Sequence, residues 1–313
     1  LVIVAVQIHF TNLRVERENK LNREIGAQLE EIEHITRHSH MLPLHDVNRE
    51  QALVKEQIEE LEVKVKELDK DGPAKHYALG RAYQEIDKTQ EALRELELAW
   101  QKGYQEPKVA YALGILLSQV YSRQLREIDQ IPDTQTREIE RKKLQDQIGN
   151  PALKYLEISK SGVNQTEYGE ALIAFYEGKL ELALDKTQKT FSKIPWFYEA
   201  KRLEADIYVR FGDRNQAKRQ YSEAENFYQK AQDVYQEVIK IAASDPENYD
   251  KLSDLFFRRM TSSYANDESE KINKYSQEII QITDLGIKVD RYNRENYVKR
   301  AYAYLYPGLY QAR

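Results

Sequence analysis

Four of the six histidines of this 313-residue chain lie close together near its N-terminus, where they could bind a metal ion. They are His34, His38, His40 and His45, and Asp46 follows them directly. His34 and His38 are four positions apart, a spacing that places both rings on one helix face and can chelate zinc. A zinc site needs a third ligand held in place, whereas His40 and His45 lie on either side of Pro43. We therefore predict no metal site, and interpret the segment as a polar turn with three packed apolar residues: Met41, Leu42 and Leu44.

Other residue patterns that would indicate catalysis are missing from the sequence. No Ser–His–Asp or Cys–His arrangement is readable, and zero cysteines exclude disulfides and thiolate metal sites. The chain has 52 acidic residues, but on charged helices most carboxylates face solvent or pair with Lys and Arg at i, i+4. A formal net charge of −5 argues against a general nucleic-acid binder. We predict no catalytic residue, no cofactor and no nucleic-acid partner.

Tyrosine is the residue type most out of proportion in the composition. There are 22 tyrosines against 8 phenylalanines and 2 tryptophans. Only 12 glycines and 8 prolines are present, which is few for a β-sandwich, a barrel or a series of tight hairpins. This composition favours an all-α fold, and suits a helical interaction surface better than a catalytic cleft.

Two long helices are expected before the rest of the chain, over residues 11–37 and 47–68, with a break between them. In each, apolar residues recur at steps of four and three and form one stripe. The first stripe is Leu21, Ile25, Leu29, Ile32 and Ile35, and the second is Val54, Ile58, Leu61, Val65 and Leu68. The pattern predicts a helical hairpin or stalk over residues 11–70.

The first ten residues form an apolar run that two interpretations can explain. Residues 1–6 are all apolar, and Ile8 and Phe10 follow. Six residues cannot span a bilayer, which takes about 20, so the run is either the end of a transmembrane helix or a buried helix start. We favour the end of a transmembrane helix over residues 1–10, because a strongly polar helix follows at once and leaves no amphipathic face to continue.

From Pro73 onward the sequence repeats with a period of 34 residues. With Pro73 as position 1, Leu79-Gly80 fall at positions 7 and 8, and the next Leu-Gly pair, Leu113-Gly114, lies 34 positions later. Units starting at 164 and 198 are again 34 apart and carry alanine at position 8. Small residues at positions 8 and 20 let the two helices of a unit approach closely, which is the tetratricopeptide (TPR) signature. We predict TPR-like pairs over residues 73–246, stacked as a right-handed superhelix.

Two of these units are expanded, and the repeats degrade after them. The second contains 23 extra residues around 122–150, which we expect to lengthen both of its helices. In the fourth, the second-helix pattern comes seven residues late. Residues 247–313 are expected to hold degenerate helical repeats, with helices at 249–260, 272–285 and 296–306. A polar linker at 261–270 joins the first two, and Pro307-Gly308 closes the last.

The repeat register also predicts a ligand-binding groove. In a TPR stack, positions 2, 5, 9 and 12 of each first helix point into the concave face. Position 5 is Tyr77, Tyr111 and Tyr168 in the first three units and Arg202 in the fourth, and position 9 of the first is Arg81. Tyrosine rings offer rigid contact area and guanidinium groups bind carboxylates, so these residues could hold an extended peptide. The alternative is that the tyrosines only pack against neighbouring helices.

Taken in order, several segments resemble those of a known family, the C-terminal TPR regions of certain bacterial transmembrane serine/threonine protein kinases. The resemblance covers roughly residues 10–260. Besides the first helix, it is carried by MLPLHD at 41–46, HYALGR at 76–81, VAYALG at 109–114, NPAL at 150–153, LIAFYEG at 172–178 and PWFYEAK at 195–201. The resemblance implies a kinase domain before a transmembrane helix, and a sensing or partner-docking role for the repeats outside the membrane.

The chain itself is not expected to phosphorylate anything, since it contains no glycine-rich loop and no catalytic-loop or Asp-Phe-Gly motif. We therefore predict a non-catalytic region of a membrane-anchored bacterial signalling kinase that binds a protein or peptide. The alternative is a free-standing soluble TPR adaptor or scaffold. The resemblance places the repeats outside the cytoplasm, in the periplasm. The basic residues after the apolar run, from Arg14 to Arg23, favour the cytoplasmic side instead.

Overall fold

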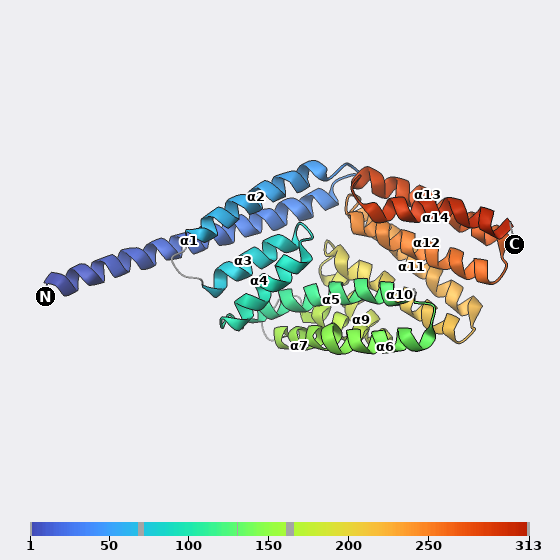
Figure 1. The fold of residues 1–313 in the computed structure, drawn as a ribbon, viewed down its shortest axis with the longest axis horizontal. Helices are drawn as coiled ribbons and strands as arrows, with labels where there is room; N and C mark the ends of the chain where they lie inside the picture. The colour runs from blue at the N-terminus through green and yellow to red at the C-terminus, as the bar shows by residue number, and fades with distance from the viewer. Residues whose placement is uncertain (1, 68–71, 130, 161–165, 312–313) are drawn as a thin grey trace. The chain divides into compact units, whose positions relative to one another are not determined.

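The chain folds into helices joined by short connections, as a computed structural model shows for residues 2–67, 72–129, 131–160 and 166–311 (Figure 1). Within these ranges there is no β-strand. The elements of the first half are α1 (Val2–Met41), α2 (Asn48–Lys66), α3 (Pro73–Gln84), α4 (Thr89–Gln101), α5 (Pro107–Asp129), α6 (Thr134–Leu144), the π-helical η1 (Gln145–Gly149), α7 (Asn150–Ser159) and α8 (Thr166–Tyr176). Those of the second half are α9 (Leu180–Lys193), α10 (Tyr198–Ala217), α11 (Tyr221–Ile241), α12 (Pro246–Ala265), α13 (Ser269–Val289) and α14 (Arg294–Gln311). The predicted all-α fold is confirmed.

The helices belong to two compact units. The first contains Leu1–Thr36 and Glu50–Tyr176, and the second contains Arg37–Arg49 and Glu177–Arg313. The boundary at Tyr176 lies within the stretch of predicted repeats. The end of α1 and the turn after it belong to the second unit, although α1 begins in the first.

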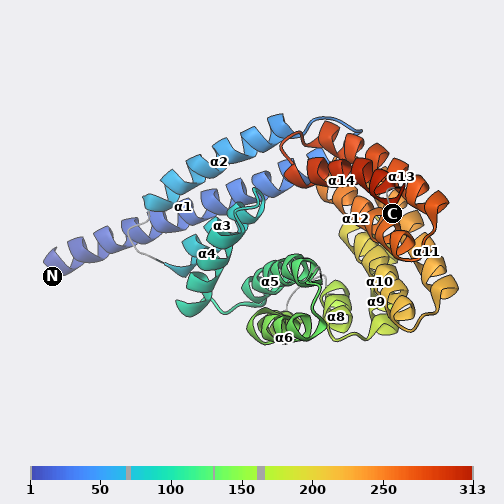
Figure 2. The same cartoon turned by 45° about the vertical axis from the view of Figure 1, so that its right-hand side comes forward.

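In the first unit, α1 and α2 lie side by side as the expected hairpin (Figure 2). Their apolar stripes make its core. Ile32, Ile58 and Leu61 are almost fully buried there, and Ala78 and Ala82 of α3 pack into the same cluster. Gln28 donates from Nε2 to the carbonyl oxygen of Gln57 (2.9 Å) across the pair. α1 continues to Met41 rather than ending at residue 37 as predicted. No residue before Pro43 interrupts the helix.

The first unit continues with two TPR-like helix pairs, α3 with α4 and α5 with α7. A Cβ atom at Gly80 would lie 2.6 Å from Cγ of Leu96 on α4, and one at Gly114 would lie 2.7 Å from Cγ of Leu156 on α7. Both glycines occupy position 8 of their repeat. The close approach of the paired helices therefore requires the small residue that the 34-residue period places there.

The second pair is larger than the first, in agreement with its extra residues. α5 extends to Asp129, and α6 and η1 precede α7 and pack against α5. The hydroxyl of Tyr121 on α5 donates to Oε1 of Gln145 in η1 (2.8 Å). α6, η1 and α7 follow one another without a break, so the extra residues lengthen both helices of this pair, as predicted.

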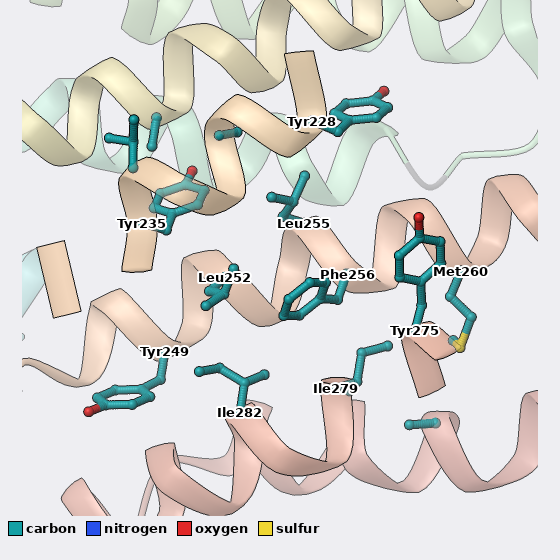
Figure 3. Close-up of a cluster of buried hydrophobic side chains, with 14 of the residues drawn as sticks. Tyr228, Tyr235, Tyr249, Leu252, Leu255, Phe256, Met260, Tyr275, Ile279 and Ile282 are labelled. Atoms are coloured by element: carbon teal, nitrogen blue, oxygen red, sulfur yellow. The ribbon is translucent and has the colours of Figure 1, made fainter. Parts of the chain in front are cut away.

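The second unit contains the pairs α10 with α11 and α12 with α13, which share one core with α14. Figure 3 shows part of this core, in which Tyr235, Tyr249 and Phe256 are among the largest buried side chains. α10 and α11 have 20 and 21 residues, against 12 and 13 in α3 and α4. Seven residues make about two helical turns, so the shifted pattern of the fourth repeat keeps its apolar side chains on the same face.

The C-terminal helices differ from prediction at two places. The polar linker is shorter than predicted, because α12 runs to Ala265 and α13 begins at Ser269. Pro307 does not end the last helix, which continues to Gln311. A proline lacks the N–H that would bond to the carbonyl four residues earlier, which is that of Ala303. The hydroxyl of Ser276 on α13 donates to this carbonyl oxygen instead, and so satisfies the group that Pro307 leaves free.

None of the helices, within the residues that the structure describes, is both long and apolar enough to cross a membrane. The side chains of the first fifteen residues lie outside that description. The predicted transmembrane segment at residues 1–10 therefore stays a prediction.

Candidate functional site

The three predicted groove tyrosines lie on three helices of the first unit, two of which are the first helices of its TPR-like pairs. Tyr77 is on α3, Tyr111 on α5 and Tyr168 on α8, and each is half-buried. α3 contacts α5. The hydroxyl of Tyr176 at the end of α8 donates to the carbonyl oxygen of Ser118 on α5 (3.1 Å), so α5 neighbours both other helices. We call Tyr77, Tyr111 and Tyr168 the tyrosine row.

Tyr77 forms an aromatic corner with a fixed positive charge. Its ring meets that of Tyr104 edge to face, with centroids 5.6 Å apart. Nζ of Lys108 lies 5.5 Å from the Tyr77 centroid and 5.0 Å from that of Tyr104, within the range of cation–π attraction. A hydrogen bond with Tyr104 raises the pKa of Lys108, which keeps the ammonium charged. Nζ of Lys108 also lies 3.4 Å from Oε2 of Glu106, and both side chains are about half exposed. The corner thus combines aromatic faces with a solvent-accessible cation, for which a ligand carboxylate would compete with Glu106.

Lys108 is not among the predicted groove residues, although the repeat register points to it. Lys108 occupies position 2 of the second repeat, which is one of the positions expected to face the groove. The groove prediction used position 5 because the residues there are tyrosines in the first three repeats. The position of Lys108 in the repeat therefore identifies it as a groove residue, whereas its residue type alone does not.

Arg81, the predicted arginine at one end of the row, has a carboxylate partner within the first unit. Its guanidinium lies 2.7 Å from Oε1 of Glu33 on α1. Burial lowers the pKa of Arg81, but Glu33, Tyr77 and Glu85 together outweigh burial and the net pKa is raised. Arg81 thus ties the first TPR-like pair to the hairpin.

Arg202, the other predicted arginine, belongs to the second unit and is engaged there. Its side chain is 12% exposed and contacts Asp245 (2.7 Å) and Glu247 (2.8 Å). Burial would raise the pKa of Asp245, yet the charges of Arg202 and His40 hold it below its usual value. Arg202 therefore joins α10 to the start of α12.

Residues 37–49 lie against this same region of the second unit. The guanidinium of Arg37 is bonded to both carboxylate oxygens of Glu199 (2.6 and 3.4 Å). It also lies 5.4 Å from the ring centroid of Trp196. Nδ1 of His40 is 3.3 Å from the hydroxyl of Tyr198. The structure thus brings together two segments, 37–46 and 195–201, that the sequence separates by about 150 residues.

The turn after α1 is held by polar contacts and not by the apolar packing that was predicted. Met41 and Leu44 are 37% and 41% exposed, so that prediction was wrong for these two residues. The amide of Val47 donates to the carbonyl oxygen of Val289 (3.0 Å), and the Val47 side chain is buried in the core of the second unit. Over the described stretches of the chain, no group of three or more His, Cys, Asp and Glu residues could hold a metal ion.

No protein-family model matches the chain, and no curated protein matches it. Several solved structures are similar at low identity. The nuclear import adaptor Nro1 of S. pombe is 13% identical, with a TM-score of 0.42, over 92% of this chain and 99% of that one. The C-terminal part of a TPR repeat-containing protein from Cytophaga hutchinsonii is 15% identical, with a TM-score of 0.30, over 81% and 96%. MamA from strain RS-1 is 15% identical, with a TM-score of 0.36, over 67% and 96%. Identities and TM-scores this low do not allow a function to be assigned to this chain. The TPR-like fold is inferred from the helix pairs themselves.

Proposed function

We propose that the chain is a non-catalytic protein-docking region that binds an extended peptide along the tyrosine row. The observation that carries this proposal is the corner formed by Tyr77, Tyr104 and Lys108, where two aromatic faces and a cation meet. An acidic or C-terminal carboxylate of the peptide would bind Lys108, and its backbone and apolar side chains would lie along the row. Rigid tyrosine rings lose little conformational entropy on binding.

A peptide selection tests this function directly. A random peptide library is selected on the immobilised chain, and the enriched peptides are titrated against wild type and Lys108→Ala. We expect enriched peptides with an acidic group, and binding at least about tenfold weaker to Lys108→Ala, as loss of a charge-assisted hydrogen bond implies. Lys189→Ala is the matched control, since Lys189 is similarly exposed and pairs only with Asp185 of its own helix. Peptides that bind both variants equally would contradict the assignment.

The finer proposal is that this region belongs to a membrane-anchored bacterial serine/threonine kinase and lies in the periplasm. Its support is the family resemblance, together with the contact between one segment that carries it, 195–201, and the residues just before another, 41–46. Arg37 and His40, just before the 41–46 motif, contact Trp196, Tyr198 and Glu199 of the 195–201 motif. The end of α1 that leads into the 41–46 motif is therefore packed on the 195–201 motif. A soluble TPR adaptor is equally compatible with the fold.

Two measurements separate these alternatives. The coding sequence upstream of Leu1 should contain a kinase domain followed by an apolar stretch that completes a span of about 20 residues. A reporter fused after Arg313 in the full-length protein should be active in the periplasm. A chain that is complete without those elements, or a reporter active only in the cytoplasm, would favour the adaptor.

A further inference from the structure

The last helix of the second unit, α14, exposes an apolar and aromatic face. It packs against α13 and α12 through its other side, where Asn296 and Ala303 are fully buried. Tyr304, Leu305 and Leu309 are each more than half exposed. Between Ala301 and Gln311 the helix carries no charged residue. Contiguous apolar patches of this kind on a protein surface mark interaction sites.

The exposed face of α14 corresponds to the face of α10 against which α11 packs. With the first residue of each helix as position 1, Asn296 and Ala303 match Ala200 and Ile207, which are also buried. Ala301 then matches Ala205, and Gly308 matches Gly212. A Cβ at Gly212 would collide with the ring of Tyr228 on α11, whereas a Cβ at Gly308 would meet nothing within 4 Å. α14 thus has the small residues that admit a partner helix, but no helix covers them in this structure.

We infer that a second copy of this chain covers the face, with the two α14 helices packed antiparallel about a two-fold axis. The face has a symmetric order: small Ala301, large Tyr304, large Leu305 and small Gly308, at spacings of three, one and three. When a second α14 runs in the opposite direction, Ala301 of each copy lies opposite Gly308 of the other. The large residues then meet at the centre. An isologous contact requires such a self-complementary surface.

Charge also favours a second copy as the occupant. Two identical surfaces repel each other when they carry net charge, and no charged residue is present over the eleven residues from Ala301 to Gln311. The two basic residues that directly precede this face on α14 bind carboxylates of their own unit. Lys299 contacts Asp254, and Arg300 contacts Asp284 (2.6 Å). The helix is about 27 Å long at 1.5 Å per residue, so the pair can bury a continuous strip of aromatic side chains.

Sedimentation equilibrium of the whole chain tests this inference. Wild type should show a species of twice the 36.9 kDa monomer mass within the micromolar range. Leu305→Glu, which places a carboxylate at the centre of the contact, should raise the dimer dissociation constant at least about tenfold. Leu182→Glu is the matched control, because Leu182 is 47% exposed on α9 against 55% for Leu305, and should leave the dimer unchanged. A monomer at all concentrations, or a dimer that Leu305→Glu does not weaken, would overturn the inference.

A cross-linking measurement keeps the test valid if Leu305→Glu perturbs the fold. Because the chain has no cysteine, Leu305→Cys and Leu182→Cys each introduce a single thiol. Under mild oxidation, Leu305→Cys should form a disulfide-linked dimer much faster than Leu182→Cys, since residue 305 lies near the two-fold axis. Equal rates would mean that α14 is not the contact, and a helix from another protein would then be the occupant to seek.

Discussion

The hydroxyl oxygen of Ser244 lies 2.8 Å from Nδ1 of His45, a residue 199 positions earlier in the chain. The same hydroxyl accepts a hydrogen bond from the backbone amide of His45 (3.1 Å) and lies 3.1 Å from the carbonyl oxygen of Pro43. The amide of Ser244 donates to the carbonyl oxygen of His40 (2.9 Å). One fully buried serine between α11 and α12 therefore holds the turn that follows α1.

Removing this hydroxyl should loosen the turn. Ser244→Ala removes the hydrogen bonds between this buried hydroxyl and the partly exposed residues 43 and 45, which should lower the free energy of unfolding by about 1 kcal/mol. Amide hydrogen exchange should also increase over residues 37–49. The control is Ser159→Ala, because Ser159 is equally buried but bonds only within its own helix, to the carbonyl of Leu156. Equal losses of stability, with unchanged exchange at the turn, would show that Ser244 does not anchor it.

Asp250 should make stability depend on pH. Burial raises the pKa of its carboxyl to about 7, although Lys299 and Asn293 act in the opposite direction. The folded protein thus keeps the proton while the unfolded chain ionises near pH 3.8. The favourable contribution is complete below pH 3.8 and is lost as pH rises through 7.

Asp250→Asn removes this dependence, and the comparison of the two proteins cancels the titration of all other groups. We expect the variant to gain stability relative to wild type between pH 5 and pH 8, by at most about 3 kcal/mol at about 1.4 kcal/mol per pH unit. Urea unfolding at several pH values measures the gain. A stability difference that is the same at pH 5 and pH 8 would contradict a raised pKa.

The close packing of paired helices predicts opposite effects of alanine at two helical glycines. Gly212→Ala would press a methyl group on the ring of Tyr228, whose hydroxyl is held by Asp213 (2.9 Å) and Gln216 (2.7 Å). The ring cannot move away easily, so a loss of about 1–3 kcal/mol is expected. Gly26→Ala meets open space in α1 and should stabilise by up to about 1 kcal/mol. Thermal unfolding of both variants checks the signs, and a stabilised Gly212→Ala would refute the packing.

The repeat region was predictable from the sequence because its signals are local and periodic. α3, α5 and α10 begin at Pro73, Pro107 and Tyr198, which are the first positions of repeats in the 34-residue register. The continuation of α14 through Pro307 was not predictable, because it depends on Ser276 of another helix. The contacts of the 37–49 segment were missed for the same reason. They are single polar interactions with residues about 160 to 240 positions away, and such contacts produce no repeating pattern of residues in the sequence.

The candidate site was predicted only in part. The register places the tyrosine row on neighbouring helices, and all three rings are half-buried, but whether they bind a ligand stays a prediction. The arginines show why residue type is a weak guide. Arg81 and Arg202 have the chemistry to bind a carboxylate, yet each is already held in an ion pair that is largely buried within its own unit. The pair of Lys108 with Glu106 is about half exposed, so its cation remains accessible to a ligand.

The central claim is that the tyrosine row binds a peptide, and the most direct measurement is a titration of one selected peptide against Tyr111→Ala, Tyr168→Ala and wild type. Each variant should weaken binding by about tenfold or more, at 1–3 kcal/mol per lost aromatic anchor. The melting temperature should change little, because half-buried rings contribute less to stability than core residues do. Unchanged affinity together with a large fall in melting temperature would contradict the claim and show that the tyrosines serve only to pack the helices.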